Sequence, residues 1–348
     1  MVLKPFLVVR RACPLRFPGL VDDPLRRAPG KKGQFLMPAR PTLHVIVNEK
    51  SGATGKSAGS ERLADLFARS GANARILLAE GGDAVARLAR QALGEKGDTI
   101  VAGGGDGTVS TVASLLVGSG RPLGVLPMGT FNYFARGLGI PLDLEAAART
   151  VLDGTLVHVD VGEVNGRFFL NNSSLGLYPD ILKEREQVYA RFGRSRLAAY
   201  ASVAFAISRP SRFLAMRLVA DEEEIFRRTP LLFVANNAYQ VKAFGLRGAP
   251  CLQKSAFALY ITHPLGPTRM FLLAIRTLLG RLRTSEDLDV LCTREVSIET
   301  RRRRLRVATD GELTVMESPL HYRVRPGALA VIAPARAGIE KGRETGDR

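Results

Sequence analysis

Short apolar runs alternate with helical patterns between about residues 43 and 150. The runs fall at 43–47, 74–79, 99–102 and 123–126. After the first and third runs, apolar residues recur at the three- and four-residue spacing of one helix face, and a similar pattern covers 83–93. A repeated strand–helix rhythm of this kind predicts a parallel, doubly wound sheet with helices on both faces.

The pattern changes after about residue 155, where short strand candidates are separated by turns. Asn165-Gly166 and Asp310-Gly311 are two-residue hairpin signals. We expect strands at 157–163, 167–171, 214–220, 224–226, 231–235, 256–262, 296–299, 304–309 and 312–317, and helices near 183–208 and 268–282. Many short strands of this type predict a mainly antiparallel sandwich.

Three strand ends of the first part carry loop residues suited to a ligand: Asn48–Gly52, Gly103–Thr108 and Gly129–Asn132. Ligands of doubly wound sheets bind beyond the carboxyl ends of the strands. Glycines followed by a helix expose backbone N–H groups and a positive dipole end, which suit a phosphate. The loops therefore predict a nucleotide site, with a ligand-free tight turn at Gly103–Thr108 as the alternative.

Asp106 is the carboxylate within the glycine loop. Since phosphate and carboxylate repel each other, Asp106 is expected to hold a divalent cation, a hydroxyl or a loop donor. Thr108 or Ser110 is expected to cap the first turn of the helix that follows.

The chain ends are polar and the charge is strongly positive. The 348 residues have a net charge of +17, of which residues 1–40 carry +7. We expect 1–40 to be a basic, disordered arm, or sequence upstream of a true start at Met37, and 336–348 to be a polar tail. The charge implies a polyanionic partner such as an anionic membrane surface or phosphorylated ligands. No nucleic-acid-binding motif is found, so we expect no nucleic-acid partner.

The cysteines and the apolar segments indicate the cellular compartment of the protein and its relation to membranes. Cys13, Cys251 and Cys292 show no metal or redox spacing, which favours reduced thiols and a cytosolic protein. The apolar segments 197–208 and 270–280 are shorter than the ~20 residues that cross a bilayer. We therefore expect a cytoplasmic protein that associates with membranes at most peripherally.

The densest charge run is Arg301–Arg304 with Arg306. Alternate residues of a strand face opposite sides, so these arginines cannot all contact one partner. A solvated sheet edge and a membrane-docking patch are both consistent with the run.

Four motifs in order resemble the diacylglycerol kinase catalytic-domain family, which includes bacterial soluble diacylglycerol kinases and sphingosine kinases. They are Asn48-Glu-Lys-Ser-Gly52, Gly104-Gly-Asp-Gly-Thr108, Gly129-Thr-Phe-Asn-Tyr-Phe-Ala-Arg-Gly-Leu-Gly-Ile-Pro141 and Asp310-Gly-Glu312, and Phe169–Tyr178 looks like the family's entry to the lipid domain. The resemblance covers about 43–335. It implies a Rossmann-like, phosphofructokinase-like nucleotide domain over 41–155 and a β-sandwich lipid domain over 156–335, with the active site in a cleft between them.

The resemblance also implies an activity, ATP-dependent phosphorylation of a lipid hydroxyl with Mg²⁺, and diacylglycerol is the leading substrate. Glu312 is the general base that the family implies, and Asp310 assists it or holds metal. The residues that would bind the nucleotide are Asn48, Ser51, Gly52, Gly104, Gly105, Asp106, Gly107, Thr108, Thr130 and Asn132. No metal ligand is assigned, and a homodimer is left open.

Two departures from the family pattern keep other functions open. Tyr133 replaces an aspartate, and the stretch before residue 256 lacks the acidic turn that bacterial lipid kinases carry there. The alternatives are an NAD kinase or another small-molecule kinase with the same glycine loop, and a catalytically degraded lipid-binding regulatory protein.

Overall fold

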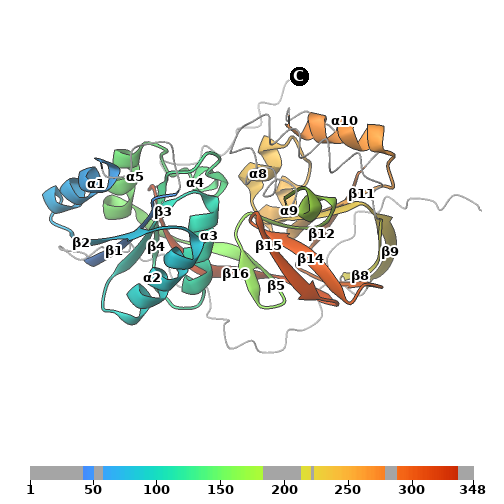
Figure 1. Ribbon diagram of the computed structural model, residues 1–348, viewed down its shortest axis with the longest axis horizontal. Helices are drawn as coiled ribbons and strands as arrows, with labels where there is room; N and C mark the ends of the chain where they lie inside the picture. Colours follow the sequence, from blue (N-terminus) through green and yellow to red (C-terminus); the bar gives the residue numbers. More distant parts are fainter. Residues whose placement is uncertain (1–41, 51–57, 183–212, 221–222, 279–287, 336–348) are drawn as a thin grey trace, which may run out of the picture. The chain divides into compact units, whose positions relative to one another are not determined.

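The computed structural model describes residues 42–50, 58–182, 213–220, 223–278 and 288–335 (Figure 1). Its helices are α1 (Ala58–Arg69), α2 (Gly82–Gly94), α3 (Asp106–Leu116), α4 (Tyr133–Gly137), α5 (Leu144–Asp153), α8 (Ala238–Ala243), α9 (Ala249–Gln253) and α10 (Pro267–Leu278). The strands up to residue 176 are β1 (Thr42–Asn48), β2 (Asn73–Ala79), β3 (Thr99–Gly104), β4 (Leu123–Pro127), β5 (Thr155–Val164), β6 (Arg167–Phe169) and β7 (Asn172–Gly176). The later strands are β8 (Leu214–Ala220), β9 (Glu223–Thr229), β10 (Leu231–Ala235), β11 (Phe257–Thr262), β12 (Leu288–Thr293), β13 (Glu295–Thr300), β14 (Arg304–Thr309), β15 (Glu312–Glu317) and β16 (Leu320–Ala333).

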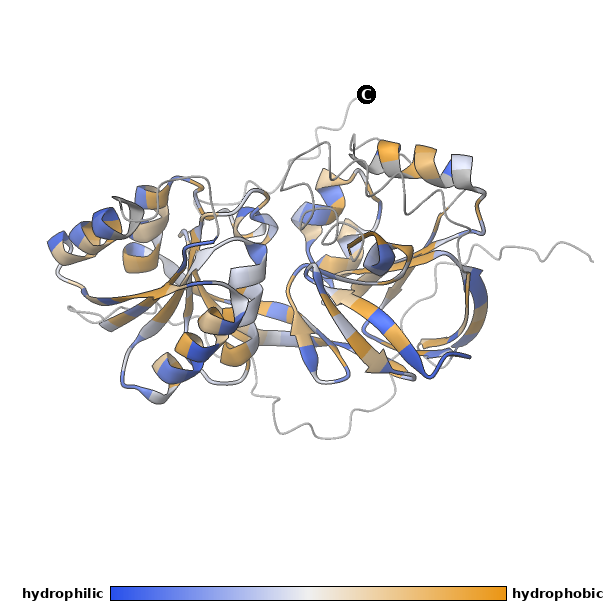
Figure 2. Ribbon diagram, viewed as in Figure 1, coloured by the Kyte–Doolittle hydropathy of each residue, from blue (hydrophilic) through white to orange (hydrophobic). Residues whose placement is uncertain are grey.

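The first part of the chain forms the predicted parallel sheet, in the order β2-β1-β3-β4. Helix α1 packs on α5 and α2 packs on α3, and the two pairs cover opposite faces of the sheet (Figure 1). Every residue of β3 and β4 is consequently buried, which explains why these strands are apolar on both faces (Figure 2).

Strand β16 continues this sheet and was not predicted. It pairs in parallel with β4, through Val331 and Leu123, and in antiparallel with β5 and β13. The resulting ten-stranded sheet runs β2-β1-β3-β4-β16-β13-β8-β9, with β5 and β6 attached beside β16. The pairing of β16 with β5 shifts register between Arg325 and Leu329. Pro326 and Gly327 fall at this irregularity, and such residues usually indicate the end of a strand.

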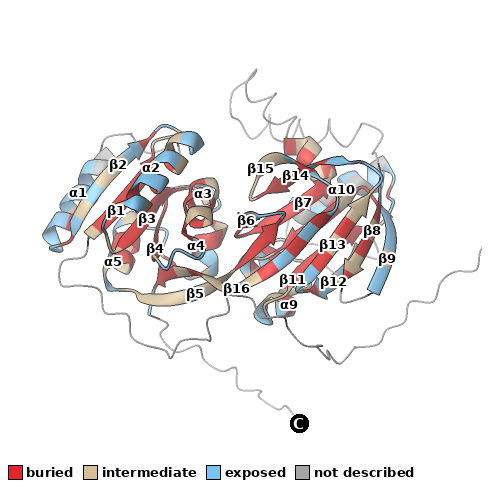
Figure 3. Cartoon of the chain, turned by 90° about the horizontal axis from the view of Figure 1, so that it is seen from below, coloured by how far each residue is buried: buried red, intermediate tan, exposed pale blue. Residues whose placement is uncertain are grey.

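A second, six-stranded antiparallel sheet has the order β12-β11-β10-β7-β14-β15. Its apolar residues share one core with the antiparallel strands of the first sheet. The core includes Leu218, Ile298 and Tyr322 of the first sheet and Leu232, Leu259 and Val307 of the second (Figure 3). This face-to-face packing confirms the predicted β-sandwich.

Both predicted hairpin turns are confirmed. Asn165 and Gly166 have φ of 45° and 82°, and Asp310 and Gly311 have φ of 49° and 86°. Positive φ at both central residues belongs to the tight turn that matches the twist of paired strands. The Asp310 turn joins β14 to β15, with Thr309 opposite Glu312.

The predicted cap of the glycine-loop helix is wrong. Helix α3 begins at Asp106, with Gly105 at the N-cap and no side-chain cap hydrogen bond. Thr108 and Ser110 therefore lie inside the helix, where their hydroxyls bond other parts of the structure. Strand β3 leads into the helix with so little loop that the first turn begins before Thr108.

The expectation of reduced thiols is wrong for two cysteines, because Cys251 and Cys292 are joined by a disulfide across 41 residues. Cys251 lies in α9, and Cys292 lies in β12, where it pairs with Ala258 of β11. Pairing of β11 with β12 brings the two together, which sequence spacing does not indicate. Cys13 lies outside the described residues.

Contacts place residues 34–348 in one compact unit. The proposed division near residue 155 stays a prediction, and it coincides with the start of β5. Three predicted segments lie outside the described residues: the arm over 1–40, the helix near 183–208 and the tail over 336–348. Within the part that is described, no helix is long and apolar enough to span a bilayer.

Candidate active site

Three parallel strands end side by side, as the sequence predicted. Val47 pairs with Gly103, and Gly104 pairs with Pro127, so β1, β3 and β4 end at the same edge of the sheet. The buried Asn48 donates its side-chain N–H to Thr108 Oγ1 at 3.0 Å, which joins the end of β1 to the first turn of α3. The strand ends predicted to bind a nucleotide are thus connected to one another.

The second and third loops pack backbone against backbone. A Cβ added to Gly129 would lie 2.4 Å from the Cα of Gly105, so only glycine allows this approach. Asn132, in the left-handed region at φ 51°, closes the loop with two hydrogen bonds to Gly129. Its Oδ1 accepts from Gly129 N at 3.0 Å and its Nδ2 donates to Gly129 O at 2.8 Å. Asn132 therefore shapes the loop.

Asp106 connects the glycine loop to the loop after β4. Its Oδ1 accepts from the backbone N–H of Phe134 at 3.1 Å and, at a longer 3.4 Å, from the side-chain amide of Asn171. This is the loop-donor role that the sequence offered as one of three roles for Asp106. Its other oxygen, Oδ2, has no hydrogen-bond partner among the described residues.

Asp310 is held by four donors from two directions. Oδ1 accepts from the N–H groups of Asn171 and Asn172 at 2.8 and 3.0 Å, and Oδ2 accepts from Leu170 N at 2.7 Å. The fourth donor is the hydroxyl of Ser110 on α3, 2.6 Å from Oδ2. Burial raises the pKa of Asp310, while these four hydrogen bonds act in the opposite direction. With both oxygens engaged, this carboxylate is placed to organise the site.

Glu312 lies two residues further on and is half-exposed. Its Oε2 pairs with the guanidinium of Arg167 at 2.6 Å, and the Nε of Arg167 donates to Thr309 Oγ1 at 3.0 Å. Arg167 follows the Asn165-Gly166 turn, so one hairpin orients the glutamate of the other. A carboxyl group that solvent reaches is accessible to a substrate hydroxyl, as a general base must be.

Asn171 bridges the two groups of predicted residues. Its backbone N–H binds Asp310, its side-chain N–H contacts Asp106, and its Oδ1 accepts from Asn237 Nδ2 at 2.7 Å. Asn237 also donates to the carbonyl of Tyr133 at 3.1 Å, and its own Oδ1 caps α8 by accepting from two backbone N–H groups. One hydrogen-bonded network therefore joins the glycine loop, the Asp310 hairpin and α8.

Tyr133, which stands where the family usually has aspartate, belongs to an aromatic cluster. Its ring stacks on the exposed Phe131 at 5.3 Å between centroids and meets the edge of Phe244 at 5.9 Å. Burial, and next the charge of Asp106, raise the pKa of the phenol, which keeps it neutral. The position thus supplies an apolar ring where a carboxylate would add charge beside Asp106.

The predicted site residues fall into three groups. One group lies together at the strand ends and comprises Asn48, Gly104, Gly105, Asp106, Gly107, Thr108 and Asn132. Thr130 is exposed beside this group. Asp310 is connected to it by hydrogen bonds through Asn171 and Ser110. In the described part of the chain, no hydrogen bond or ion pair joins Glu312 to the glycine loop. Ser51 and Gly52 lie outside the described residues.

Sequence reasoning missed Ser110, Arg167, Asn171 and Asn237. The sequence predicts Ser110 only as a helix cap, and it places Asn171 only within the segment that resembles the family's entry to the lipid domain. The one available signal was the polar pair Asn171-Asn172 after the apolar Phe168–Leu170. Which partners these side chains meet depends on strands far apart in sequence.

The site can be tested for its fit to a divalent cation. Among the described residues, no three His, Cys, Asp or Glu side chains cluster as a metal site. Mg²⁺ needs less than that, because it is commonly held by one or two carboxylates, waters and the phosphates of a substrate. Oδ2 of Asp106, at the carboxyl ends of the parallel strands, fits that minimal requirement.

Comparison with known proteins identifies the first part of the chain. Residues 42–164 match the family model described as "Diacylglycerol kinase catalytic domain". This segment belongs to that family, as its motifs indicated.

Two curated relatives match parts of the same region. "Probable lipid kinase YegS-like" of Pseudomonas aeruginosa is 45% identical over 128 residues, which is 35% of this chain and 42% of the relative. "Diacylglycerol kinase" of Bacillus subtilis is 47% identical over 93 residues, 26% of this chain and 30% of the relative. The matched segment thus spans less than half of either relative.

A solved structure matches over a longer stretch. A crystal structure of a diacylglycerol kinase from Bacillus anthracis aligns with a TM-score of 0.60 at 19% identity and covers 84% of this chain and 97% of that one. At this identity the likeness establishes the fold, including the β-sandwich.

Proposed function

We propose that the protein is a lipid kinase that transfers the γ-phosphate of ATP to a lipid hydroxyl, with diacylglycerol as the leading substrate. The observation that carries the proposal is the network in which Asn171 and Ser110 join the glycine loop to the Asp310-Gly-Glu312 hairpin. A kinase needs a phosphate site and a proton acceptor held at a fixed separation, and this network supplies that constraint.

Each part of the site has a role in this proposal. The N–H groups at the start of α3 and the close-packed loop at Gly129 bind and orient the phosphates. Asp106 would hold Mg²⁺, which when bound would neutralise the charge of the phosphates. Glu312 accepts the proton of the lipid hydroxyl, and Asp310 fixes the hairpin that presents Glu312. Arg167 orients the glutamate through their ion pair.

The lipid substrate places the reaction at a membrane surface. We infer peripheral association with an anionic leaflet, because the chain carries a net charge of +17. Cytoplasmic location, ATP as donor and a homodimer belong to the same proposal. The cysteines do not support a cytoplasmic location, since Cys251 and Cys292 form a disulfide.

The proposal is tested with purified protein, γ-labelled ATP and MgCl₂, offered mixed lipid vesicles, NAD and sugar phosphates in parallel. Label in phosphatidic acid supports a diacylglycerol kinase, and label in another lipid keeps the lipid kinase and changes its substrate. Label found only in NADP would instead establish the NAD kinase alternative.

Replacing Glu312 with Gln tests the base. We expect turnover to fall by about 10²–10⁴-fold, the usual contribution of general acid–base catalysis, with little change in ATP binding. Glu317→Gln, on the same strand and also paired with an arginine, is the matched control and should keep its turnover. Vesicle binding with no ATP consumption in the parent protein would favour the degraded regulatory protein.

A further inference from the structure

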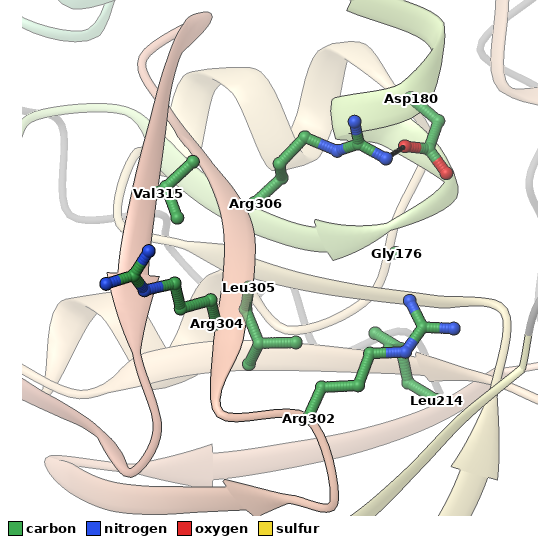
Figure 4. A pocket seen from close by; sticks show the side chains of 8 residues that line it. All are labelled: Gly176, Asp180, Leu214, Arg302, Arg304, Leu305, Arg306 and Val315. Atoms are coloured by element: carbon green, nitrogen blue, oxygen red, sulfur yellow. Dashed lines mark ion pairs between the residues drawn. The ribbon is translucent and has the colours of Figure 1, made fainter.

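The arginine run singled out in the sequence lines a small cavity that the proposed kinase site does not use. Arg302, Arg304 and Arg306 surround a space of about 180 Å³ together with residues of β7, β8 and β15 (Figure 4). We call this cavity the arginine pocket; its lining residues are Gly176, Asp180, Leu214, Arg302, Arg304, Leu305, Arg306 and Val315.

Strand geometry determines which arginines reach the pocket. Arg304 and Arg306 are two residues apart on β14, so they lie on one exposed face, and Leu305 between them is buried in the sandwich core. Arg302 precedes the strand, and its side chain lies beside Leu214 of β8 (Figure 4). Arg301 and Arg303 belong to the same run but do not line the pocket.

The charges of the pocket are only partly balanced. Arg306 pairs with Asp180 at 2.8 Å, and Arg304 approaches Glu317 at 3.6 Å, both between exposed side chains. Among the described residues, no acidic side chain pairs with the exposed Arg302. A guanidinium presents a planar set of N–H donors that matches phosphate, so this arrangement favours a phosphate group as ligand.

The pocket also has an exposed apolar residue, Val315, while its lining residues Leu214 and Leu305 are buried in the sandwich core. A free inorganic anion gains nothing from such surface. A phospholipid brings a phosphate together with apolar acyl chains, which are joined to it through the glycerol. The combination of arginines with apolar residues therefore favours an amphiphile.

The pocket is separate from the candidate active site. Arg306 is the lining residue of β14 nearest to Asp310, which follows the last residue of the strand, Thr309. Four residues of extended strand separate the two and cover roughly 13 Å. A ligand in the pocket therefore does not contact the residues proposed for phosphoryl transfer.

We propose that the arginine pocket binds the phosphate of an anionic phospholipid, as a docking site distinct from the catalytic one. This names a site for the association with an anionic leaflet that is inferred above, and it rests on that part of the proposed function but not on kinase activity. The pocket holds the protein at an anionic surface through a headgroup that is not the substrate.

The test uses the full-length protein and vesicles of phosphatidylglycerol and phosphatidylcholine, or of phosphatidylcholine alone. The pocket variant Arg302→Ala/Arg306→Ala is compared with the control Arg301→Ala/Arg303→Ala, which removes the same charge from the same run. Each arginine removed near an anionic surface costs about 1 kcal/mol of binding, a factor of about five, and both variants suffer this general loss. We expect the pocket variant to bind the anionic vesicles about tenfold more weakly than the control.

Further variants and ligands decide between the remaining outcomes. Arg302→Lys/Arg306→Lys keeps the charge and is expected to bind between parent and pocket variant, since lysine lacks the planar donor set. Equal weakening in the pocket and control variants would mean diffuse electrostatics and overturn the pocket. If the pocket variant loses binding of inorganic phosphate while its vesicle binding matches the control, the phospholipid is overturned as the ligand. Unchanged unfolding temperatures verify that each variant is folded.

Discussion

At the scale of single residues, the site depends on groups whose roles come from their neighbours. Asp310 is a hairpin residue by sequence, yet its carboxylate binds three backbone N–H groups and the hydroxyl of Ser110. Asn132 takes a left-handed conformation and closes the loop beside Gly129. Gly129 in turn allows a close approach to the backbone of Gly105.

Gly129→Ala tests that approach. The new Cβ would meet Gly105 Cα at 2.4 Å, so the loops must separate. We expect a loss of about 1–3 kcal/mol in the free energy of unfolding, the usual cost of overpacking, and weaker ATP binding. Urea unfolding and ATP titration measure the two effects.

Gly107→Ala is the matched control, because nothing lies within 4 Å of a Cβ at that helical position. Its stability should stay the same or rise by up to ~1 kcal/mol, since alanine favours a helix. Equal stability of the two variants would contradict the close packing of the loops.

At the scale of elements, β5 and β16 connect the parallel strands to the sandwich, and one charge cluster lies on this pair. The buried Glu163 of β5 accepts from Arg323 at 3.0 Å and from Arg325 at 2.6 Å, both on β16. Burial by itself would raise the pKa of Glu163, but the hydrogen bonds and charges of the two arginines outweigh it and lower the pKa below its ordinary 4.5.

This lowered pKa predicts a pH dependence of stability. The carboxylate binds protons less readily in the folded chain, so its contribution is present above about pH 4.5 and is lost as pH falls through the lower folded value. We expect Glu163→Gln to cost about 2–3 kcal/mol at pH 6, less than a fully buried pair because Arg323 is half-exposed, and much less near pH 3.

Unfolding of parent and variant by urea between pH 6 and pH 3 measures the difference. Glu145→Gln removes an exposed pair with Arg149 and should cost no more than about 0.5 kcal/mol at any of these pH values. A deficit in Glu163→Gln that stays constant with pH would show that the arginines do not lower this pKa.

At the scale of the whole molecule, a few side-chain hydrogen bonds couple the glycine-loop helix to the sandwich. Ser110 of α3 reaches Asp310, 200 residues later, at 2.6 Å. Asn171 and Asn237 make a second connection through Asp106 and the Tyr133 carbonyl. The proposed phosphate site and the proposed base therefore depend on the same contacts.

A double-mutant cycle of Ser110→Ala and Asp310→Asn measures the coupling. A hydrogen bond to a charged group is worth about 1.5–3 kcal/mol, so we expect the two losses of unfolding free energy to be non-additive by at least about 1 kcal/mol. The pair Ser110→Ala and Glu312→Gln, which share no contact, should add within ~0.5 kcal/mol. Additive losses in the first pair would contradict the coupling.

Local pattern alone determined much of this protein. The alternation of apolar runs and helical faces predicted the parallel sheet. The ends of its strands predicted that Asn48, Asp106 and Asn132 lie at one edge of that sheet. The two Xaa-Gly turns predicted their hairpins, because positive φ is a local preference. Four motifs indicated the diacylglycerol kinase catalytic-domain family, which residues 42–164 confirm.

Only the tertiary structure decided the features that depend on distant pairing. β16 contains Pro326 and Gly327, so only its pairing with β5, β4 and β13 shows it to be one long strand. Asn171, Ser110 and the Cys251–Cys292 bond likewise owe their roles to segments brought together by the fold. Periodicity reports the environment of a residue but not its partner, and partners determine how a site is built.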